Sequence, residues 1–237
     1  MVGGVGSEVG ERLAQVRERV ADAARVVGRD PAEVRLLLAV KAQPAERIRE
    51  AIAAGADVLG HNRAQELQAT APDLTDLTHE MHFIGRLQSN KANKVVPLVT
   101  CVQSVDSTAI ADRLDRLAGR DERVLDVLVQ VNTSGEPTKA GAAPEEALEL
   151  ATHVGSLPHL RLRGLMTIGA NSDDDAVVRA SYERLAQLRD AVLASGTPGT
   201  GEARELSMGM SRDLETAVAA GATMVRVGTA VFGSRPA

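Results

Sequence analysis

Aromatic residues are almost absent from this chain. Its 237 residues include two phenylalanines, one tyrosine and no tryptophan, and the formal net charge is −5 from 27 basic and 32 acidic residues. A surface that binds nucleic acid needs a basic patch, and one that binds single strands also needs aromatic rings on which bases stack. The sequence has no basic stripe with interleaved aromatic residues. We therefore expect no nucleic-acid partner.

Cysteine and long apolar runs are also scarce. The single cysteine, Cys101, excludes an internal disulfide, fits a reducing compartment, and stands in the apolar stretch VTCVQ, which predicts a small buried side chain. No apolar run reaches the roughly 18 residues that a membrane-spanning helix needs. The N-terminus, MVGGVGSEVG, lacks the basic and apolar segments of a secretory signal. We predict a cytoplasmic protein with no membrane partner.

The chain does contain a regular alternation of apolar strands and amphipathic helices. The glycine-rich residues 1–7 are predicted to be flexible, and a helix is predicted from Glu8 to a stop at Gly28. Strands are predicted over residues 34–40, 57–60, 79–84, 98–103, 124–131, 160–167, 205–207 and 223–227. The helices between them are predicted over residues 44–54, 62–71, 88–96, 106–117 with Asp106 as cap, 144–154, 174–194 and 211–220.

This alternation predicts one domain over residues 8–237, a single (β/α)8 TIM barrel with an extra N-terminal helix. Segments such as LLLAV and MVRVG are apolar throughout, as parallel strands buried on both faces are. An open doubly wound sheet remains the alternative, because the strands at 57–60 and 205–207 are short. In a barrel, functional residues lie on the loops that follow the strands. Lys41, Asn62 and residues 85–91, 207–211 and 228–234 follow strands in this way, so they would converge.

Lys41 is the residue best placed for covalent chemistry. The chain has four lysines, Lys41, Lys91, Lys94 and Lys139, and Lys41 alone directly follows a buried apolar run. An amine that is partly desolvated becomes a better nucleophile and can form a Schiff base with an aldehyde. A solvated surface lysine is the alternative interpretation.

Two neighbouring loops are suited to bind an anion. Gly209 and Ser211 precede a predicted helix, which Ser211 can cap while free N–H groups face the anion. Gly228 and Thr229 follow the last strand, where TAVFGS can form a short extra helix, and phosphate sites recur after strands 7 and 8 of such barrels. Ordinary capping is the alternative, and the carboxylate of Asp213 would oppose an anion unless it points away. Pyridoxal 5′-phosphate (PLP) has both an aldehyde and a phosphate, and would use the lysine and these loops together.

Four segments carry a family resemblance: LLLAVKAQPAERIREAIAAGADVLGHNRAQE, HFIGRLQSNK, LRLRGLMTI and LSMGMSRDLETAVAAGATMVRVGTAVFG. On these motifs, residues 34–233 resemble the YggS/PROSC family of PLP homeostasis proteins. That family is similar in fold to the N-terminal barrel of bacterial alanine racemase and lacks that enzyme's second, β-rich domain.

The resemblance implies that Lys41 carries PLP as an internal aldimine. It implies a phosphate site around Ser207, Ser211, Gly228 and Thr229, with Asn62 beside the cofactor and with Arg226 and Met208 lining it. His82 fits a cofactor neighbour and a satisfied core histidine equally well. Gln88, Asn90 and Lys91 belong to the same motif, and Lys91 would be a structural residue or a second amine that contacts PLP. The cofactor-binding residues expected here are Lys41, Asn62, His82, Ser207, Met208, Gly209, Ser211, Arg226, Gly228 and Thr229.

The chain departs from the family pattern at three positions. Val40 and Ala42 stand where the family usually has serine and threonine on either side of the lysine, and His61 replaces the glutamate of Gly-Glu-Asn. Two hydroxyl groups near the aldimine are thereby lost. These changes leave the lysine and the phosphate loops in place, but they put in doubt any role of the neighbours in tuning the aldimine.

The expected function is PLP carriage and homeostasis rather than catalysis, with PLP-dependent apoenzymes as possible recipients and a monomer or weak homodimer as the assembly. The alternative is a weak PLP-dependent amino-acid racemase, which needs an acid or base on each face of the cofactor. Tyr182 lies on a core-facing stripe, so His61 or His82 would have to supply the second group. A class I aldolase is a third, weaker alternative. His79, His153 and His159 show no metal-ligand spacing, and we expect no metal.

Overall fold

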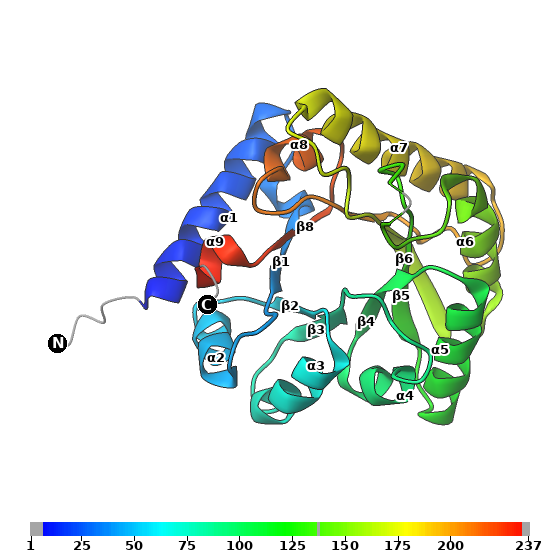
Figure 1. Cartoon of the computed structure of the whole chain (residues 1–237), viewed down its shortest axis with the longest axis horizontal. Coiled ribbons are helices and arrows are strands. Elements are labelled where there is room, and N and C mark those ends of the chain that lie inside the picture. The colour runs from blue at the N-terminus through cyan, green and yellow to red at the C-terminus, as the bar shows by residue number, and fades with distance from the viewer. Residues whose placement is uncertain (1–6, 137, 234–237) are drawn as a thin grey trace.

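Eight parallel strands close into a barrel in this computed structural model, which describes residues 7–136 and 138–233 (Figure 1). Each strand pairs with the next, and β8 pairs with β1, so the TIM barrel is confirmed and the open sheet is wrong. Of the residues 1–7 that were predicted to be flexible, 1–6 lie outside the described residues, as does Ser234, whereas Ser7 is described and precedes the first helix. The strands are β1 Arg35–Ala39, β2 Val58–His61, β3 Glu80–Phe83, β4 Cys101–Val105, β5 Leu125–Gln130, β6 Leu160–Met166, β7 Glu205–Ser207 and β8 Met224–Val227.

Helices surround the barrel. They are α1 Glu8–Val26, α2 Ala45–Ala53, α3 Ala64–Thr70, α4 Ala92–Val95, α5 Thr108–Arg120, α6 Ala147–Ser156, α7 Asp175–Ala194, α8 Leu214–Ala219 and α9 Thr229–Phe232. Short 3-10 turns are η1 Pro31–Glu33, η2 Ala71–Leu74, η3 Val96–Leu98 and η4 Pro144–Glu146. None of the described helices is both long enough and apolar enough to cross a bilayer.

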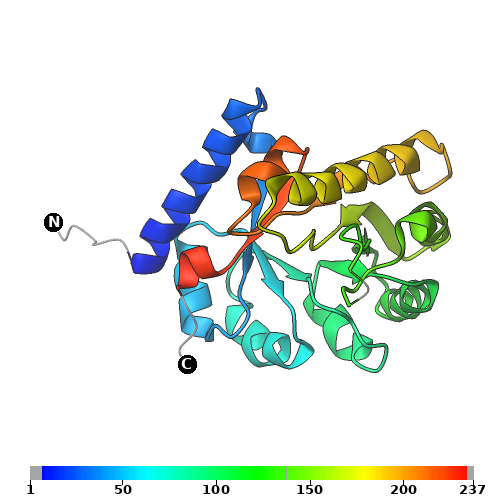
Figure 2. The same ribbon diagram turned by 45° about the horizontal axis from the view of Figure 1, so that its top comes forward.

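The extra N-terminal helix is confirmed as α1. Its buried face is Val9, Leu13, Val16 and Val20, and the Ser7 hydroxyl accepts the Gly10 N–H at 3.2 Å. In both views α1 lies beside α8 and α9, so the first and last described helices are neighbours (Figures 1 and 2).

The strand residues alternate between the bore of the barrel and the layer under the helices. Leu37, Val58 and Met224 pack together inside the bore. Leu38 and Val40 belong to the large cluster between the sheet and the helices. This alternation decides which side chains can reach the open end of the barrel.

Three local predictions were wrong. The fourth strand begins at Cys101 rather than 98, because Pro97 lies in the 3-10 turn η3. Asp106 does not cap α5; Ser107 occupies that position and makes no side-chain cap bond. Likewise α8 begins at Leu214, three residues later than predicted, with Asp213 instead of Ser211 at its N-cap position. Cys101 is buried as predicted, and burial raises the pKa of its thiol.

Candidate ligand-binding site at the barrel mouth

Lys41 emerges at the carboxyl end of β1. The Val40 N–H still pairs with the Gly60 carbonyl at 3.0 Å, which carries the strand alternation one residue beyond Ala39. Leu37 and Ala39 are on the bore side, so Lys41 lies above the bore, and its side chain is exposed. An exposed amine at the open end of the barrel is accessible to a ligand from solvent.

The loop that carries Lys41 is held from α3. The Ala42 N–H donates to Glu66 Oε2 at 3.0 Å, and Ala42 has a left-handed φ of +58°. A left-handed alanine costs about 1 kcal/mol or more, and the bond to Glu66 helps to offset that cost. The neighbouring Val40 side chain is fully buried under the helices, so position 40 does not face the mouth.

Asn62 follows β2 and touches the loop after β3. A Cβ on Gly85 would lie 2.1 Å from the Asn62 carbonyl oxygen, so a glycine at 85 allows this approach. The Asn62 side-chain oxygen is buried and has no hydrogen-bond partner among the described residues. A buried amide oxygen without a partner is uncommon and fits contact with a ligand.

The loops after β7 and β8 are joined to each other. The Arg226 N–H in β8 donates to the Gly209 carbonyl at 3.0 Å, and Gly209 has a φ of +87°. A Cβ on Gly228 would lie 2.8 Å from the Ala39 carbonyl, which brings the start of α9 against the carboxyl end of β1, two residues before Lys41. The predicted short extra helix is confirmed as α9, with Thr229 exposed at its first position.

These loops offer backbone donors to an anion. Within the described residues, no acceptor is found for the N–H groups of Ser211, Arg212 and Gly228. The carboxylate of Asp213 does not face this space freely, because its two oxygens accept from the Met210 N–H at 2.6 Å and the Tyr182 hydroxyl at 2.9 Å. The expected conflict between Asp213 and a phosphate is therefore reduced.

Arg226 supplies a buried positive charge inside the barrel. Its guanidinium donates to Ser207 Oγ at 2.8 Å and to the Thr167 carbonyl at 2.7 Å, and the residue is 6 % exposed. Burial lowers the pKa of Arg226 to about 10. Both acceptors are neutral, and no ion pair joins Arg226 to a described carboxylate. Asp213 acts on Arg226 only from a distance, and a buried cation with no carboxylate in contact favours an anionic ligand nearby.

His82 and Ser207 are also inside the bore, where both are buried. Ser207 donates to Gln103 Oε1 at 2.6 Å, and Gln103 Nε2 lies 2.8 Å from His82 Nδ1. His82 Nε2 faces Glu80 at 3.2 Å. Both ring nitrogens of His82 and the hydroxyl of Ser207 are therefore engaged within the protein.

The side chains of one predicted site residue, Met208, and of the candidate bases His61 and Tyr182 point elsewhere. Met208 is fully buried in the cluster between sheet and helices, so its backbone alone can reach the mouth. His61 is buried with Nε2 at 2.9 Å from the Thr70 hydroxyl, and burial lowers its pKa to about 4. Tyr182 is likewise buried, and burial and Asp213 raise its pKa. These three side chains do not converge with Lys41.

The remaining motif residues lie on the loop after β3. Gln88 and Asn90 are exposed, and Lys91 is half-buried at the N-cap position of α4.

Lys139 lies on another mouth loop, where its Nζ donates to Glu136 at 2.7 Å and to the Gly169 carbonyl at 2.6 Å. This contact ties the loop after β5 to the loop after β6.

Metal ligation finds no support in the described residues, where no group of three or more candidate side chains is brought together. His153 pairs with Asp112 at 2.7 Å and His159 with Asp115 at 3.3 Å, both on the outside of the barrel.

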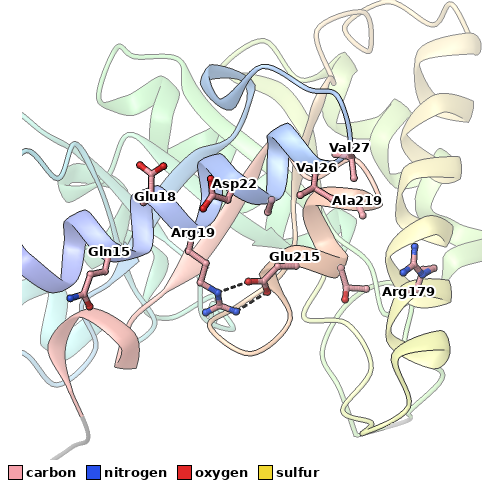
Figure 3. Close-up of a pocket in the computed structure, with 11 residues that line it drawn as sticks. Gln15, Glu18, Arg19, Asp22, Val26, Val27, Arg179, Glu215 and Ala219 are labelled. Atoms are coloured by element: carbon pink, nitrogen blue, oxygen red, sulfur yellow. Dashed lines mark hydrogen bonds and ion pairs between the residues drawn. The ribbon is translucent and has the colours of Figure 1, made fainter.

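A groove of about 730 Å³ lies on the outside, between α1, α7 and α8 (Figure 3). Arg19 of α1 and Glu215 of α8 form a bidentate ion pair there, with Nε to Oε1 at 2.5 Å and Nη2 to Oε2 at 2.7 Å. Arg19 also donates to the Ser211 carbonyl at 2.8 Å and so braces the loop after β7 from behind. The groove itself is separate from the mouth.

The side chains and backbone at the mouth fit PLP. An exposed amine, free backbone N–H groups, a buried cation and a buried amide oxygen that lacks a partner come from strands and loops at the same end of the barrel. Lys41 would take the aldehyde, the loops at Gly209–Ser211 and Gly228–Thr229 the phosphate, and Arg226 and Asn62 the polar groups of the ring.

Comparison with known proteins agrees with this arrangement. Residues 12–236 match the family described as alanine racemase, N-terminal domain. The chain belongs to that family. The PLP homeostasis protein of Pseudomonas aeruginosa is 44% identical over 230 residues, 97% of this chain and 96% of the relative. Those of Aquifex aeolicus and Escherichia coli K12 are each 40% identical, over 95% and 97% of this chain and 97% of each relative. The resemblance to PLP homeostasis proteins is thereby confirmed.

Solved structures show the same fold. PipY of Synechococcus elongatus, solved with PLP bound, is 38% identical with a TM-score of 0.84 and covers 95% of this chain and 100% of its own. An unknown protein from Bifidobacterium adolescentis is 42% identical with a TM-score of 0.92, over 96% of this chain and 95% of its own. An alanine racemase from Clostridium difficile, 16% identical with a TM-score of 0.72, shares the fold over 93% of this chain and 57% of its own.

Sequence reasoning missed three residues of this region. Gln103 was only the last residue of the strand predicted over 98–103, yet it links His82 to Ser207. Glu66 lies in the family motif HNRAQE, but nothing in the pattern connected it to the loop of Lys41. Thr167, at the end of a strand, supplies a carbonyl to Arg226.

Proposed function

We propose that this protein binds PLP reversibly as a Schiff base on Lys41 and serves PLP homeostasis as a carrier. The observation that carries the proposal is that an exposed lysine and two glycine-containing loops with free N–H groups follow the neighbouring strands β1, β7 and β8 at one end of the barrel. The names of the curated relatives and the PLP-bound PipY structure support the choice of ligand.

Each part of the ligand has a group to receive it. When bound, PLP supplies an aldehyde that condenses with an amine, releasing one water molecule, and the reverse reaction frees it. The protein would hold the phosphate at the N–H groups of Ser211, Arg212 and Gly228, while Arg226 would face the polar groups of the ring from the bore. The exposure of Lys41 leaves the linkage open to water, which suits exchange.

Carriage is favoured over racemisation by the positions of the candidate second bases. His82 has both nitrogens engaged in the bore, His61 faces Thr70, and the Tyr182 hydroxyl donates to Asp213. None of these described side chains is placed to move a proton on a face opposite Lys41. Recipient apoenzymes and the oligomeric state stay predictions.

The test is titration of the purified protein with PLP, followed by borohydride reduction and peptide mapping. We expect a visible absorbance band and one phosphopyridoxyl group, on Lys41. Lys41→Ala should abolish both, whereas Lys94→Ala, which changes an exposed lysine on α4, should leave both intact. Absence of a band in the unmodified protein, or modification that maps mainly to Lys91, would overturn the proposal.

A further inference from the structure

A chain of buried hydrogen bonds crosses the bore from Arg226 to Glu80. Arg226 Nη1 lies 2.8 Å from Ser207 Oγ, which lies 2.6 Å from Gln103 Oε1. Gln103 Nε2 lies 2.8 Å from His82 Nδ1, and His82 Nε2 lies 3.2 Å from Glu80 Oε2. Ser207 and Gln103 are fully buried, so water does not compete for these bonds.

The donors fix the direction of the whole chain. A guanidinium can only donate, so Ser207 accepts from Arg226 and its single proton goes to Gln103 Oε1. The Gln103 amide nitrogen then donates to His82 Nδ1 and, with its second hydrogen, to Met224 Sδ, which lies 3.1 Å from the nitrogen. His82 Nδ1 is therefore unprotonated, and the ring proton sits on Nε2, where it donates to the Glu80 carboxylate.

This direction links Arg226 through neutral side chains to a carboxylate at the far end of the bore. The hydrogen bonds that begin at its guanidinium end on the carboxylate of Glu80, whose pKa is lowered to about 2, first by the bond from His82. Glu80 also forms an ion pair with Arg35 at 2.8 Å. Each donor along these hydrogen bonds polarises the next, which holds the neutral residues in one orientation, whereas the charge of Glu80 itself is matched by Arg35. Gln103 is the middle residue of this chain of hydrogen bonds.

We propose that Gln103 is a positioning residue for PLP binding. By holding the Ser207 hydroxyl as an acceptor, it fixes the Arg226 guanidinium so that its remaining N–H groups face the mouth and the anionic ligand. This inference rests on the proposed function. It also assigns His82 a role through Gln103 rather than by contact with PLP.

The first test is a double-mutant cycle read out as the dissociation constant for PLP. Gln103→Met keeps an unbranched side chain and removes both polar ends, and Ser207→Ala deletes the hydroxyl that Arg226 needs. Each should weaken PLP binding roughly tenfold and shift the absorbance band, as expected for loss of a bond to a charged group. The double variant should bind PLP no more weakly than the weaker-binding single variant, because both changes break the same chain of hydrogen bonds.

The matched control is Leu128→Val, which removes volume from the bore at a residue that takes no part in the chain of hydrogen bonds. It should lower stability while PLP affinity stays within about twofold of the unmodified protein. The proposal would be overturned if the losses of PLP affinity in Gln103→Met and Ser207→Ala multiplied in the double variant. It would also be overturned if Gln103→Met bound PLP with unchanged affinity. Should Gln103→Met fail to fold, Ser207→Ala carries the same test with a single atom removed.

A second readout needs no PLP. Nitrogen-15 spectra of the imidazole rings in the ligand-free protein should show His82 with its proton on Nε2 and a hydrogen-bonded, unprotonated Nδ1, and Gln103→Met should shift the Nδ1 signal alone. A proton on Nδ1 would reverse the chain and overturn the inference. If Lys41 forms no adduct in the unmodified protein, the proposed function fails, and these spectra still decide the direction of the chain.

Discussion

The hydroxyl of Tyr182, on α7, donates a 2.9 Å hydrogen bond to the carboxylate of Asp213, at the start of α8. The other oxygen of Asp213 accepts the Met210 N–H and closes the turn that carries Ser211. The buried hydroxyl of Tyr182 therefore holds in place the loop that we assign to the phosphate. It also engages the negative charge of Asp213 away from that loop's free N–H groups. The single tyrosine of the chain acts on the candidate site from the helical layer.

Tyr182→Phe should loosen that turn. Loss of one hydrogen bond should lower the free energy of unfolding by about 1 kcal/mol and speed PLP release severalfold. Denaturant unfolding and stopped-flow dissociation measure the two effects. Ser195→Ala, which removes a hydroxyl bond of 2.7 Å to the Val192 carbonyl at the far end of α7, is the control and should affect stability alone. An unchanged release rate in Tyr182→Phe would contradict the assignment of this loop.

Gly209→Ala should damage both the fold and the site. The backbone at 209 has a φ of +87°, and a Cβ would lie 2.4 Å from the Ala217 Cβ. We expect a loss of about 2 kcal/mol or more in unfolding free energy together with much weaker PLP binding. The control is Gly201→Ala, where a Cβ meets no heavy atom within 4 Å and φ is not left-handed. Equal effects of the two substitutions would show that crowding at 209 is not the cause.

Glu66→Ala should free the loop of Lys41. The carboxylate accepts the Ala42 N–H at 3.0 Å, so its removal lets the strained Ala42 relax and the lysine move. We expect weaker PLP binding by severalfold with an adduct that still maps to Lys41. Titration of Glu66→Ala beside Glu50→Ala, an exposed residue of α2, checks this. Affinity that falls equally in both variants would point to a general loss of negative charge.

His61 should make the protein less stable in mild acid. Burial lowers its pKa from 6.5 to about 4, so between these values the unfolded chain binds a proton that the folded protein does not. The contribution of neutral His61 to the free energy of unfolding is fully present above pH 6.5 and is lost as the pH falls toward 4. Its upper limit is about 3 kcal/mol, at 1.36 kcal/mol per pKa unit.

Unfolding free energies of the unmodified protein and His61→Gln, measured from pH 4 to 7, test this. The slope that belongs to His61 should vanish in the variant. If both proteins show the same pH dependence, the histidine is not buried in its neutral form, and its bond to Thr70 is misassigned.

Local pattern was sufficient for most of the architecture. Continuous apolar strands separated by amphipathic helices predicted the barrel, and the strand at Glu205–Ser207 was placed at its observed bounds. Boundaries shifted where side chains overrode propensity, as at α8, where Asp213 rather than Ser211 precedes the helix. The carboxylate of Asp213 closes the preceding turn, which delays the start of the helix.

The sequence by itself determined the fold, the family and the position of Lys41 after the first strand, because periodicity and local motifs are properties of neighbouring residues. The tertiary structure alone decided which side chains share the bore. It joined Arg226 and Ser207 to Gln103, turned His61 and Met208 away from the mouth, and connected Tyr182 to Asp213. Those contacts link residues that are as much as 104 positions apart, and they depend on strand register and closure of the barrel, which no local pattern specifies.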